Sequence, residues 1–176
     1  MARLARVPHI GLPLLMAVAL AAAPARLPAQ TPAPAGPQEA GVIGLFLDSA
    51  SLHPTVVLEG KRDRRRFGMA IGAAEATGIV YPLENRVPPR PLTHDLFLTL
   101  FGRLKVTVTR VVITDLKGGI YYATIVLDAG GKEMQLDARP SDAIALAIRA
   151  KVPVLVEDRV FDKSELLPGS PPAPRI

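Results

Sequence analysis

The chain has 176 residues, of which 21 are lysine or arginine, 16 are aspartate or glutamate and none is cysteine, so its formal net charge is +5. The lack of cysteine excludes disulfides, thiolate metal sites and cysteine nucleophiles. Three histidines are too few for a metal centre built from histidine, which excludes that class of site as well.

Residues 1–25 have the layout of a secretory signal peptide. Arg3 and Arg6 precede an apolar run at 12–23, and small residues follow it. We expect cleavage between residues 23 and 30 and export to a periplasm or to the medium. The apolar run is too short to cross a bilayer, so we expect no stable membrane span. Removing the three arginines among residues 1–26 leaves 18 basic against 16 acidic residues, and a net charge of +2 does not require a nucleic-acid partner.

The remaining sequence divides into a linker, one domain and a tail. Residues 26–41 are rich in proline and alanine, which predicts a flexible linker. Residues 42–166 are long enough for one compact domain with its own hydrophobic core. Residues 167–176 contain four prolines and predict a disordered tail.

Hydrophobic periodicity and turn residues predict an α+β domain with a mainly antiparallel sheet. The expected elements are strands at 42–48, 55–59 and 66–71, a helix from 73 to about 84, a helix capped by Thr93, strands at 105–116, 120–128 and 132–137, a helix from Pro140 and a strand at 153–157. The apolar phase slips near Thr109 and Arg110, which predicts a β-bulge. Proline in the last strand favours a sheet edge, because proline has no N–H for the ladder.

A strand–strand–helix unit occurs twice. Residues 55–76 and 124–143 share the same order of apolar runs and polar turns, and Glu75 and Asp142 fall at equivalent places near the starts of their helices. Repeats decide the fold when they are present, and two related halves commonly pack around a pseudo-twofold axis. Such packing would bring the two helix N-termini to one cleft.

The corner between strand and helix at 137–147 is the main candidate site. Pro140 suits the first helical position, and the apolar residues after it predict a buried helix. Asp137, Arg139 and Asp142 are therefore held at the end of a rigid element. In the alternative interpretation, the same residues form a structural corner in which Arg139 pairs with the acids.

Four segments resemble the motifs of the bifunctional nuclease family, at 71–76, 90–96, 111–116 and 137–147. The resemblance extends over nearly all of 42–162. It implies activity on RNA and DNA, an antiparallel barrel-like sheet built from a duplicated unit, and a homodimer. Residues 66–70 differ from the Leu-Pro-Ile-like strand that members usually carry, and an export signal is unusual for a largely intracellular family.

Phosphodiester hydrolysis then suggests a role for each polar residue of these motifs. Carboxylates commonly hold Mg²⁺ or Mn²⁺ for this reaction, and here they would be Asp137, Asp142 and Glu75. The expected catalytic residues are His94, Asp95, Asp137, Arg139 and Asp142, with His94 and Asp95 moving protons and Arg139 holding a phosphate. As alternatives, Glu75 and Asp142 merely stabilise their helix N-termini, by about 0.3–1 kcal/mol each, and His94 is an exposed first-turn residue.

One hairpin loop gathers five cations, Lys61, Arg62, Arg64, Arg65 and Arg66. A phosphate backbone is recognised through charge, so we expect this loop to bind RNA or DNA, with a solvated turn as the alternative. Aromatic residues for base stacking are scarce: Tyr121 and Tyr122 share one strand and there is no tryptophan. Sequence-specific recognition of a single strand is therefore not expected.

Two functions stay open at this stage. The first is an exported nuclease of low sequence specificity that acts on RNA, DNA or both with help from a divalent metal. The second is a non-catalytic binding or scaffolding module of the exported compartment, in which the corner at 137–147 serves stability.

Overall fold

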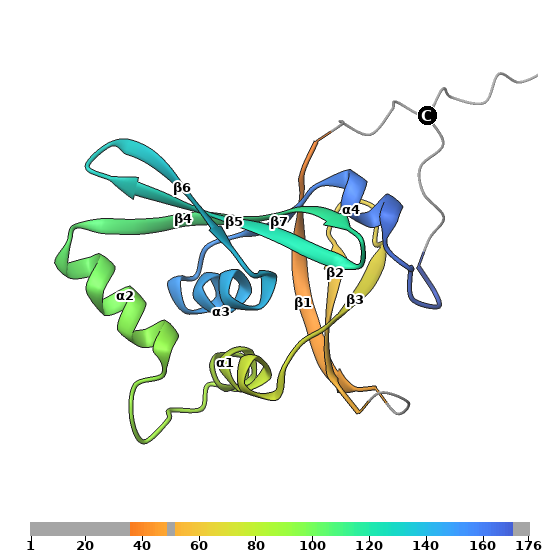
Figure 1. The fold of residues 1–176 in the computed structure, drawn as a ribbon, viewed down its shortest axis with the longest axis horizontal. Helices are drawn as coiled ribbons and strands as arrows, with labels where there is room; N and C mark the ends of the chain where they lie inside the picture. Colours follow the sequence, from red (N-terminus) through yellow and green to blue (C-terminus); the bar gives the residue numbers. More distant parts are fainter. Residues whose placement is uncertain (1–35, 49–51, 171–176) are drawn as a thin grey trace, which may run out of the picture. The chain divides into compact units, whose positions relative to one another are not determined.

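The computed structural model describes residues 36–48 and 52–170, which form a mixed α+β domain (Figure 1). The predicted signal peptide and most of the predicted linker lie outside these residues. The described elements, in chain order, are β1 (Gln38–Leu47), β2 (Pro54–Gly60), β3 (Arg66–Ala70), α1 (Ala73–Leu83), α2 (Thr93–Arg103), β4 (Val106–Lys117), β5 (Ile120–Ala129), β6 (Lys132–Ala138), α3 (Pro140–Ala150), β7 (Val154–Val156) and α4 (Asp158–Lys163).

The strands form one open sheet in the order β3-β2-β1-β7-β4-β5-β6. All neighbouring strands are antiparallel except β4 and β7, which are parallel. Because β3 and β6 are the two edge strands and do not pair with each other, the sheet is not closed, and the expected barrel-like form is not confirmed. The predicted bulge is present as a register shift between Val108 and Arg110. The strand–strand–helix order occurs twice, as β2–β3–α1 and β5–β6–α3.

Strand β7 lies inside the sheet, so its prediction as an edge strand was wrong. It pairs with β1 on one side and with β4 on the other. Pro153 precedes the strand, so its missing N–H removes no bond from the ladder, and its carbonyl accepts a hydrogen bond from the Val111 N–H at 3.1 Å. The pairing with β7 also explains why β1 begins at Gln38, inside the segment predicted as linker.

Helix α3 is buried, as predicted, and organises the other helices. Residues 143–147 are buried, and α3 packs on β4 and β5 with α1 and α2 against it (Figure 1). Helix α2 begins at Thr93, and the residue before it, Leu92, is the N-cap, so the predicted cap at Thr93 was wrong. No helix among the described residues has the length and apolar character to cross a membrane.

Strand β6 is exposed on both faces, although Met134 and Leu136 alternate with polar residues in the pattern typical of a half-buried strand. Met134 and Leu136 remain 48% and 44% exposed. These side chains stay exposed because β6 lies at the edge of the sheet. An alternating pattern buries one face of a strand only where another element packs on that face.

The C-terminal part contains a helix that the sequence pattern did not predict. Helix α4 buries Val160 and Phe161, and the ring of Phe161 meets Phe67 edge-on at 5.2 Å. Residues 167–170 fall in the predicted tail but contact β3: the Leu167 N–H donates to the Arg66 carbonyl at 2.9 Å. Residues 171–176 lie outside the described part of the chain.

Candidate functional site

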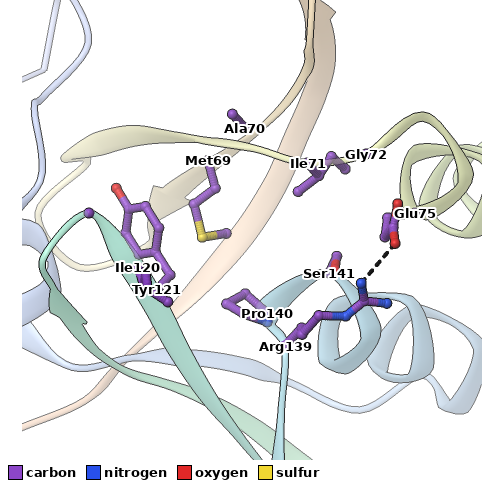
Figure 2. Close-up of a pocket in the computed structure, with 11 residues that line it drawn as sticks. Met69, Ala70, Ile71, Gly72, Glu75, Ile120, Tyr121, Arg139, Pro140 and Ser141 are labelled. Atoms are coloured by element: carbon purple, nitrogen blue, oxygen red, sulfur yellow. Dashed lines mark hydrogen bonds and ion pairs between the residues drawn. The ribbon is translucent and has the colours of Figure 1, made fainter.

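Two helix starts meet on one guanidinium. Arg139, the N-cap of α3, donates from Nη1 to Glu75 Oε1 at 2.8 Å, from Nε to Asp142 Oδ2 at 2.7 Å and from Nη2 to Asp142 Oδ1 at 3.1 Å (Figure 2 shows the bond to Glu75). Glu75 belongs to the first turn of α1 and Asp142 to the first turn of α3. The two acids at equivalent places in the sequence thus bind the same cation, as expected if the helix N-termini share a cleft.

The charges of this group stabilise one another. Partial burial by itself raises the pKa of Asp142, but hydrogen bonds and charge from Arg139, with a smaller contribution from His94, outweigh it and lower that pKa below its ordinary value. The pKa of Arg139 is raised, chiefly by Asp142 and then by Glu75. Asp142 is therefore ionised and Arg139 protonated at neutral pH.

His94 joins the group from the first turn of α2. Its Nε2 lies 3.3 Å from Asp142 Oδ1, and its side chain is 12% exposed. The other edge of the ring lies against α1, where a Cβ added to Gly78 would come within 2.7 Å of His94 Cε1 and 3.0 Å of Nδ1. Since an ionised Asp142 only accepts hydrogen bonds, Nε2 carries the proton of this pair. A glycine at position 78 is what lets the ring approach so closely.

Asp95 follows His94 in the chain but faces another partner. Its Oδ1 accepts from Arg149 Nε at 2.7 Å and its Oδ2 accepts from the Leu92 N–H at 2.8 Å. Burial alone raises the pKa of Asp95, and the bonds from Arg149 and Leu92 outweigh it, so the pKa is lowered. The structure therefore brings His94, but not Asp95, to Asp142. Asp95 holds the start of α2.

Arg149 is a residue that the sequence reasoning missed. Its side chain is 8% exposed, and besides Asp95 it donates to the carbonyls of Gly78, at 2.5 Å, and Ala145, at 3.0 Å. It therefore ties α1, α2 and α3 together directly behind His94. The available signal was a charged residue directly after the apolar run at 143–148 of a buried helix.

Asp137 lies at the end of the edge strand β6 and is exposed. Within the described ranges, no side-chain hydrogen bond or ion pair reaches its carboxylate. It nevertheless shares a cleft with His94, Arg139 and Asp142, so three of its predicted companions are close by. Its carboxylate keeps its full capacity to accept hydrogen bonds from a ligand.

Two cavities open on the group, and Arg139 lines both. The first, of about 390 Å³, is lined by Glu75, Ser141 and Tyr121, among others (Figure 2). The second, of about 490 Å³, lies between α2, α3 and the end of β6. The predicted polar residues therefore stand at the walls of real cavities rather than on a flat surface.

The carboxylates do not fit a metal centre in this arrangement. In the described part of the chain, no three histidine, aspartate or glutamate side chains gather in a way that could hold a metal ion. Glu75 and Asp142 instead bind the guanidinium of Arg139, and Mg²⁺ needs several oxygen ligands in near-octahedral geometry. The assignment of Mg²⁺ or Mn²⁺ to Asp137, Asp142 and Glu75 stays a prediction.

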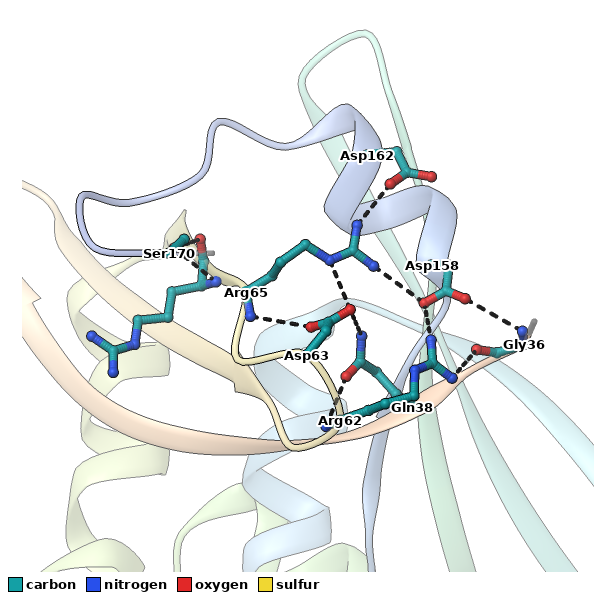
Figure 3. A network of polar contacts seen from close by, with 9 residues as sticks. Gly36, Gln38, Arg62, Asp63, Arg65, Asp158, Asp162 and Ser170 are labelled. Atoms are coloured by element: carbon teal, nitrogen blue, oxygen red, sulfur yellow. Dashed lines mark hydrogen bonds and ion pairs between the residues drawn. The ribbon is translucent and has the colours of Figure 1, made fainter. Parts of the chain in front are cut away.

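The basic loop is a structural junction (Figure 3). Arg65, only 2% exposed, donates to Asp63 at 2.8 Å, to Asp162 at 2.7 Å and to Asp158 at 3.3 Å. Arg62 also binds Asp158, at 2.5 Å. The loop between β2 and β3 is thereby fixed to α4, whose acids are spaced four residues apart.

The other three cations of the loop also have carboxylate partners. Arg64 and Arg66 bind Glu59 at 2.7 Å and 2.5 Å, and Lys61 binds Glu39. A phosphate would have to compete with these acids for each cation. Nucleic-acid binding by Lys61, Arg62, Arg64, Arg65 and Arg66 stays a prediction to which this geometry adds no support.

Comparisons with known proteins agree on one family. The family model described as the bifunctional nuclease domain matches residues 56–168. Uncharacterized proteins from two strains of Mycobacterium tuberculosis are 35% identical to this chain over 129 residues, which make up 73% of this chain and 77% of theirs. Bifunctional nuclease 1 of Oryza sativa subsp. indica is 36% identical over 81 residues, which make up 44% of this chain and only 24% of the rice protein.

Proposed function

Because this chain belongs to the bifunctional nuclease domain family, we propose that it is a nuclease that hydrolyses phosphodiester bonds of RNA, DNA or both with low sequence specificity. One observation supports the proposal most directly. Three helix starts place Glu75, His94 and Asp142 around Arg139, at the walls of two cavities. A cation beside a pair of proton-exchanging groups is the equipment that phosphodiester hydrolysis needs.

Arg139 is the residue proposed to hold the phosphate. A guanidinium has five N–H donors, and the bonds to Glu75 and Asp142 engage three of them. The remaining two, one on each terminal nitrogen, suit the non-bridging oxygens of a phosphodiester. The side chain is 65% exposed, so a substrate reaches it without rearrangement of the core. Glu75 and Asp142 fix its orientation.

His94 and Asp142 are proposed to move the proton. Asp142 accepts the Nε2–H of His94, and both side chains line the second cavity beside Arg139. We assign to this pair the transfer of a proton from an attacking water and its return to the leaving oxygen. This chain's own residues thus supply charge stabilisation and proton transfer, and no step is assigned to a metal because the donors do not fit one.

The test is cleavage of labelled single- and double-stranded RNA and DNA, with Mg²⁺, with Mn²⁺ and with EDTA. Arg139→Met and Asp142→Asn are expected to lower kcat/KM by about 100-fold or more. The matched controls are Arg110→Met and Glu133→Gln. Each removes one partner of an exposed ion pair, with 3.0 Å between Arg110 Nη2 and Glu133 Oε2, and neither residue lines either cavity. Both variants are expected to change kcat/KM by less than about twofold.

Two results would count against the proposal in different ways. Unchanged turnover in folded Arg139→Met and Asp142→Asn would refute the assignment of these residues. A folded wild-type protein that cleaves no substrate under any of the three conditions would refute the nuclease itself. Loss of cleavage in EDTA would show that the reaction needs a divalent metal.

The second candidate is a non-catalytic binding or scaffolding module, and one observation favours it. Glu75, His94 and Asp142 find partners inside the protein, as they would in a corner built only for stability. This function predicts that Asp142→Asn lowers the melting temperature while the wild type shows no turnover to lose.

We also propose that the protein is exported and forms a homodimer. Export is supported by the signal-like sequence at 1–25, and sequencing the N-terminus of protein recovered from the periplasm or medium tests it, with a start between residues 23 and 30 expected. A dimer is supported by the exposed stripe of Leu96 and Leu100 on α2 and Leu104 at its C-cap. Light scattering that gives the mass of one chain would refute it.

A further inference from the structure

A cleft with apolar walls lies directly beside the proposed site. It has a volume of about 490 Å³ and is walled by Phe97 and Phe101 of α2, Leu136 of β6, Ile125 of β5 and Leu146 of α3. Phe97 and Leu136 are each 44% exposed. They stay exposed because α2 buries none of its residues and β6 is an edge strand.

The rim of this cleft is charged. His94, Asp137, Arg139 and Asp142 line it together with the apolar side chains. A protein partner in this cleft would have to remove four ionisable groups from water, and the centres of protein interfaces are depleted of charged residues. A small ring with apolar faces and a polar edge matches both parts of the cleft at once.

We propose that this cleft binds one unpaired nucleobase of the substrate strand, an inference that rests on the proposed nuclease function. The ring of Phe97 offers a stacking face, and its tilted contact with Phe101, at 6.0 Å and 51°, restrains the ring. The free carboxylate of Asp137 accepts a hydrogen bond from an exocyclic amino group, as acidic side chains do with cytosine. The phosphate attached to that nucleotide then meets the two unused donors of Arg139.

The cavity shown in Figure 2 offers no comparable stacking face. Its aromatic side chain, Tyr121, is stacked on Phe67 with ring centres 5.6 Å apart, and its hydroxyl contacts Ser164 Oγ at 3.1 Å. The cleft beside α2 is therefore the place for the base. The sequence reasoning counted Tyr121 and Tyr122 for stacking and passed over the phenylalanines of α2.

A base in this cleft makes the enzyme selective for single strands. Bases of a duplex are paired and stacked, and each must be turned out of the helix before it enters a pocket. An unpaired strand does not have this cost. Stacking also tolerates every base, so the cleft is consistent with low sequence specificity, with a modest preference for bases that carry an amino group.

Binding is tested first, because it does not depend on turnover. Titration calorimetry of the full exported chain with CMP, UMP and ribose 5-phosphate is expected to show CMP binding about tenfold more tightly than ribose 5-phosphate. Phe97→Ala removes this difference and Phe97→Leu, which keeps apolar volume without a ring, reduces it. Asp137→Asn removes the preference for CMP over UMP. Phe46→Ala, which truncates a ring on β1 that is 60% exposed, leaves all three affinities unchanged.

Cleavage is tested next, on one oligonucleotide as a single strand and as a duplex. Wild type is expected to cleave the single strand faster, and Phe97→Ala to raise its KM about tenfold with kcat changed by less than about twofold. Equal affinity of wild type for CMP and ribose 5-phosphate would overturn the base site, as would unchanged affinities in folded Phe97→Ala. Conversion of a dimer to a monomer by Phe97→Ala would assign the cleft to a second copy of the chain and overturn it too.

Failure of this inference is distinguishable from failure of the proposed function. If wild type cleaves its substrates and Phe97→Ala has the same KM and affinities, the base site is refuted but the proposed nuclease function is not. Base-dependent binding of CMP that Phe97→Ala abolishes, in a protein that cleaves nothing, supports the base site and refutes the nuclease.

Discussion

Replacing Arg65 by methionine is expected to lower the free energy of unfolding by about 3–5 kcal/mol, because it removes one partner of a buried ion pair. The magnitude follows from the burial of the pair: the side chains of Arg65 and Asp63 are 2% and 9% exposed. Methionine keeps the aliphatic part of the side chain but not the guanidinium, whose carbon lies 4.7 Å from the ring centre of Phe161, so the loss includes this cation–π contact as well as the ion pair. The more exposed partners, Asp158 and Asp162, contribute less.

The same change has a pH signature. Burial by itself raises the pKa of Asp63, but hydrogen bonds from Gln38 and Arg65 and the charge of Arg65 lower it overall. A carboxyl with a lowered folded pKa stabilises the native state above its unfolded value of about 3.9 and loses that contribution as the pH falls through the folded value. The difference in free energy of unfolding between wild type and Arg65→Met is therefore largest above about pH 5 and decreases below about pH 4.

Urea unfolding followed by circular dichroism measures the loss of free energy and its dependence on pH. Thermal unfolding of Arg65→Met at neutral pH is expected to show a fall in melting temperature on the order of 10–15 °C. The matched control is Arg64→Met, since Arg64 lies in the same loop but is 62% exposed and its buried partner Glu59 keeps its ion pair with Arg66; a loss of less than about 1 kcal/mol is expected. Equal losses in the two variants would refute the reasoning. A loss below about 1 kcal/mol in Arg65→Met would do so as well.

Three further changes test the neighbourhood of the site. Arg149→Met is expected to lower the free energy of unfolding by about 2–4 kcal/mol and to speed hydrogen exchange in α2, because Asp95 and two carbonyls lose their donor; unchanged exchange would contradict this role. Gly78→Ala is expected to displace His94 and lower turnover at least about tenfold, whereas Gly102→Ala, which meets open space in α2, gains about 0.5–1 kcal/mol of stability and keeps its activity. Asp142→Asn is expected to lower the melting temperature at pH 7, and the difference from wild type is expected to shrink progressively below about pH 4, because the wild type loses the contribution of ionised Asp142 as the pH falls through its lowered pKa; a difference that stays constant down to the acid limit of folding would contradict the ion pair.

Part of the candidate site could be predicted from the sequence. Glu75, Arg139 and Asp142 stood in recognisable motifs at helix starts, and the structure brings them together. Asp95 stood in the same kind of motif but bonds to Arg149, because the partner of a side chain depends on which helix packs against it. The basic loop read as a solvated or phosphate-binding turn, yet Arg65 is buried against acids about 95 residues away in the chain.

Most of the secondary elements, the bulge near Arg110, the buried helix α3 and the family could be predicted from the sequence, because each of these follows from short-range periodicity, turn chemistry or contiguous motifs; helix α4 could not. The open sheet, the place of β7 inside it and the exposure of β6 became visible only in the folded molecule. The same is true of the pairing of Glu75 with Arg139 and of the cleft that Phe97 lines. These features depend on contacts between residues far apart in the chain, and local pattern carries no information about which surfaces will meet.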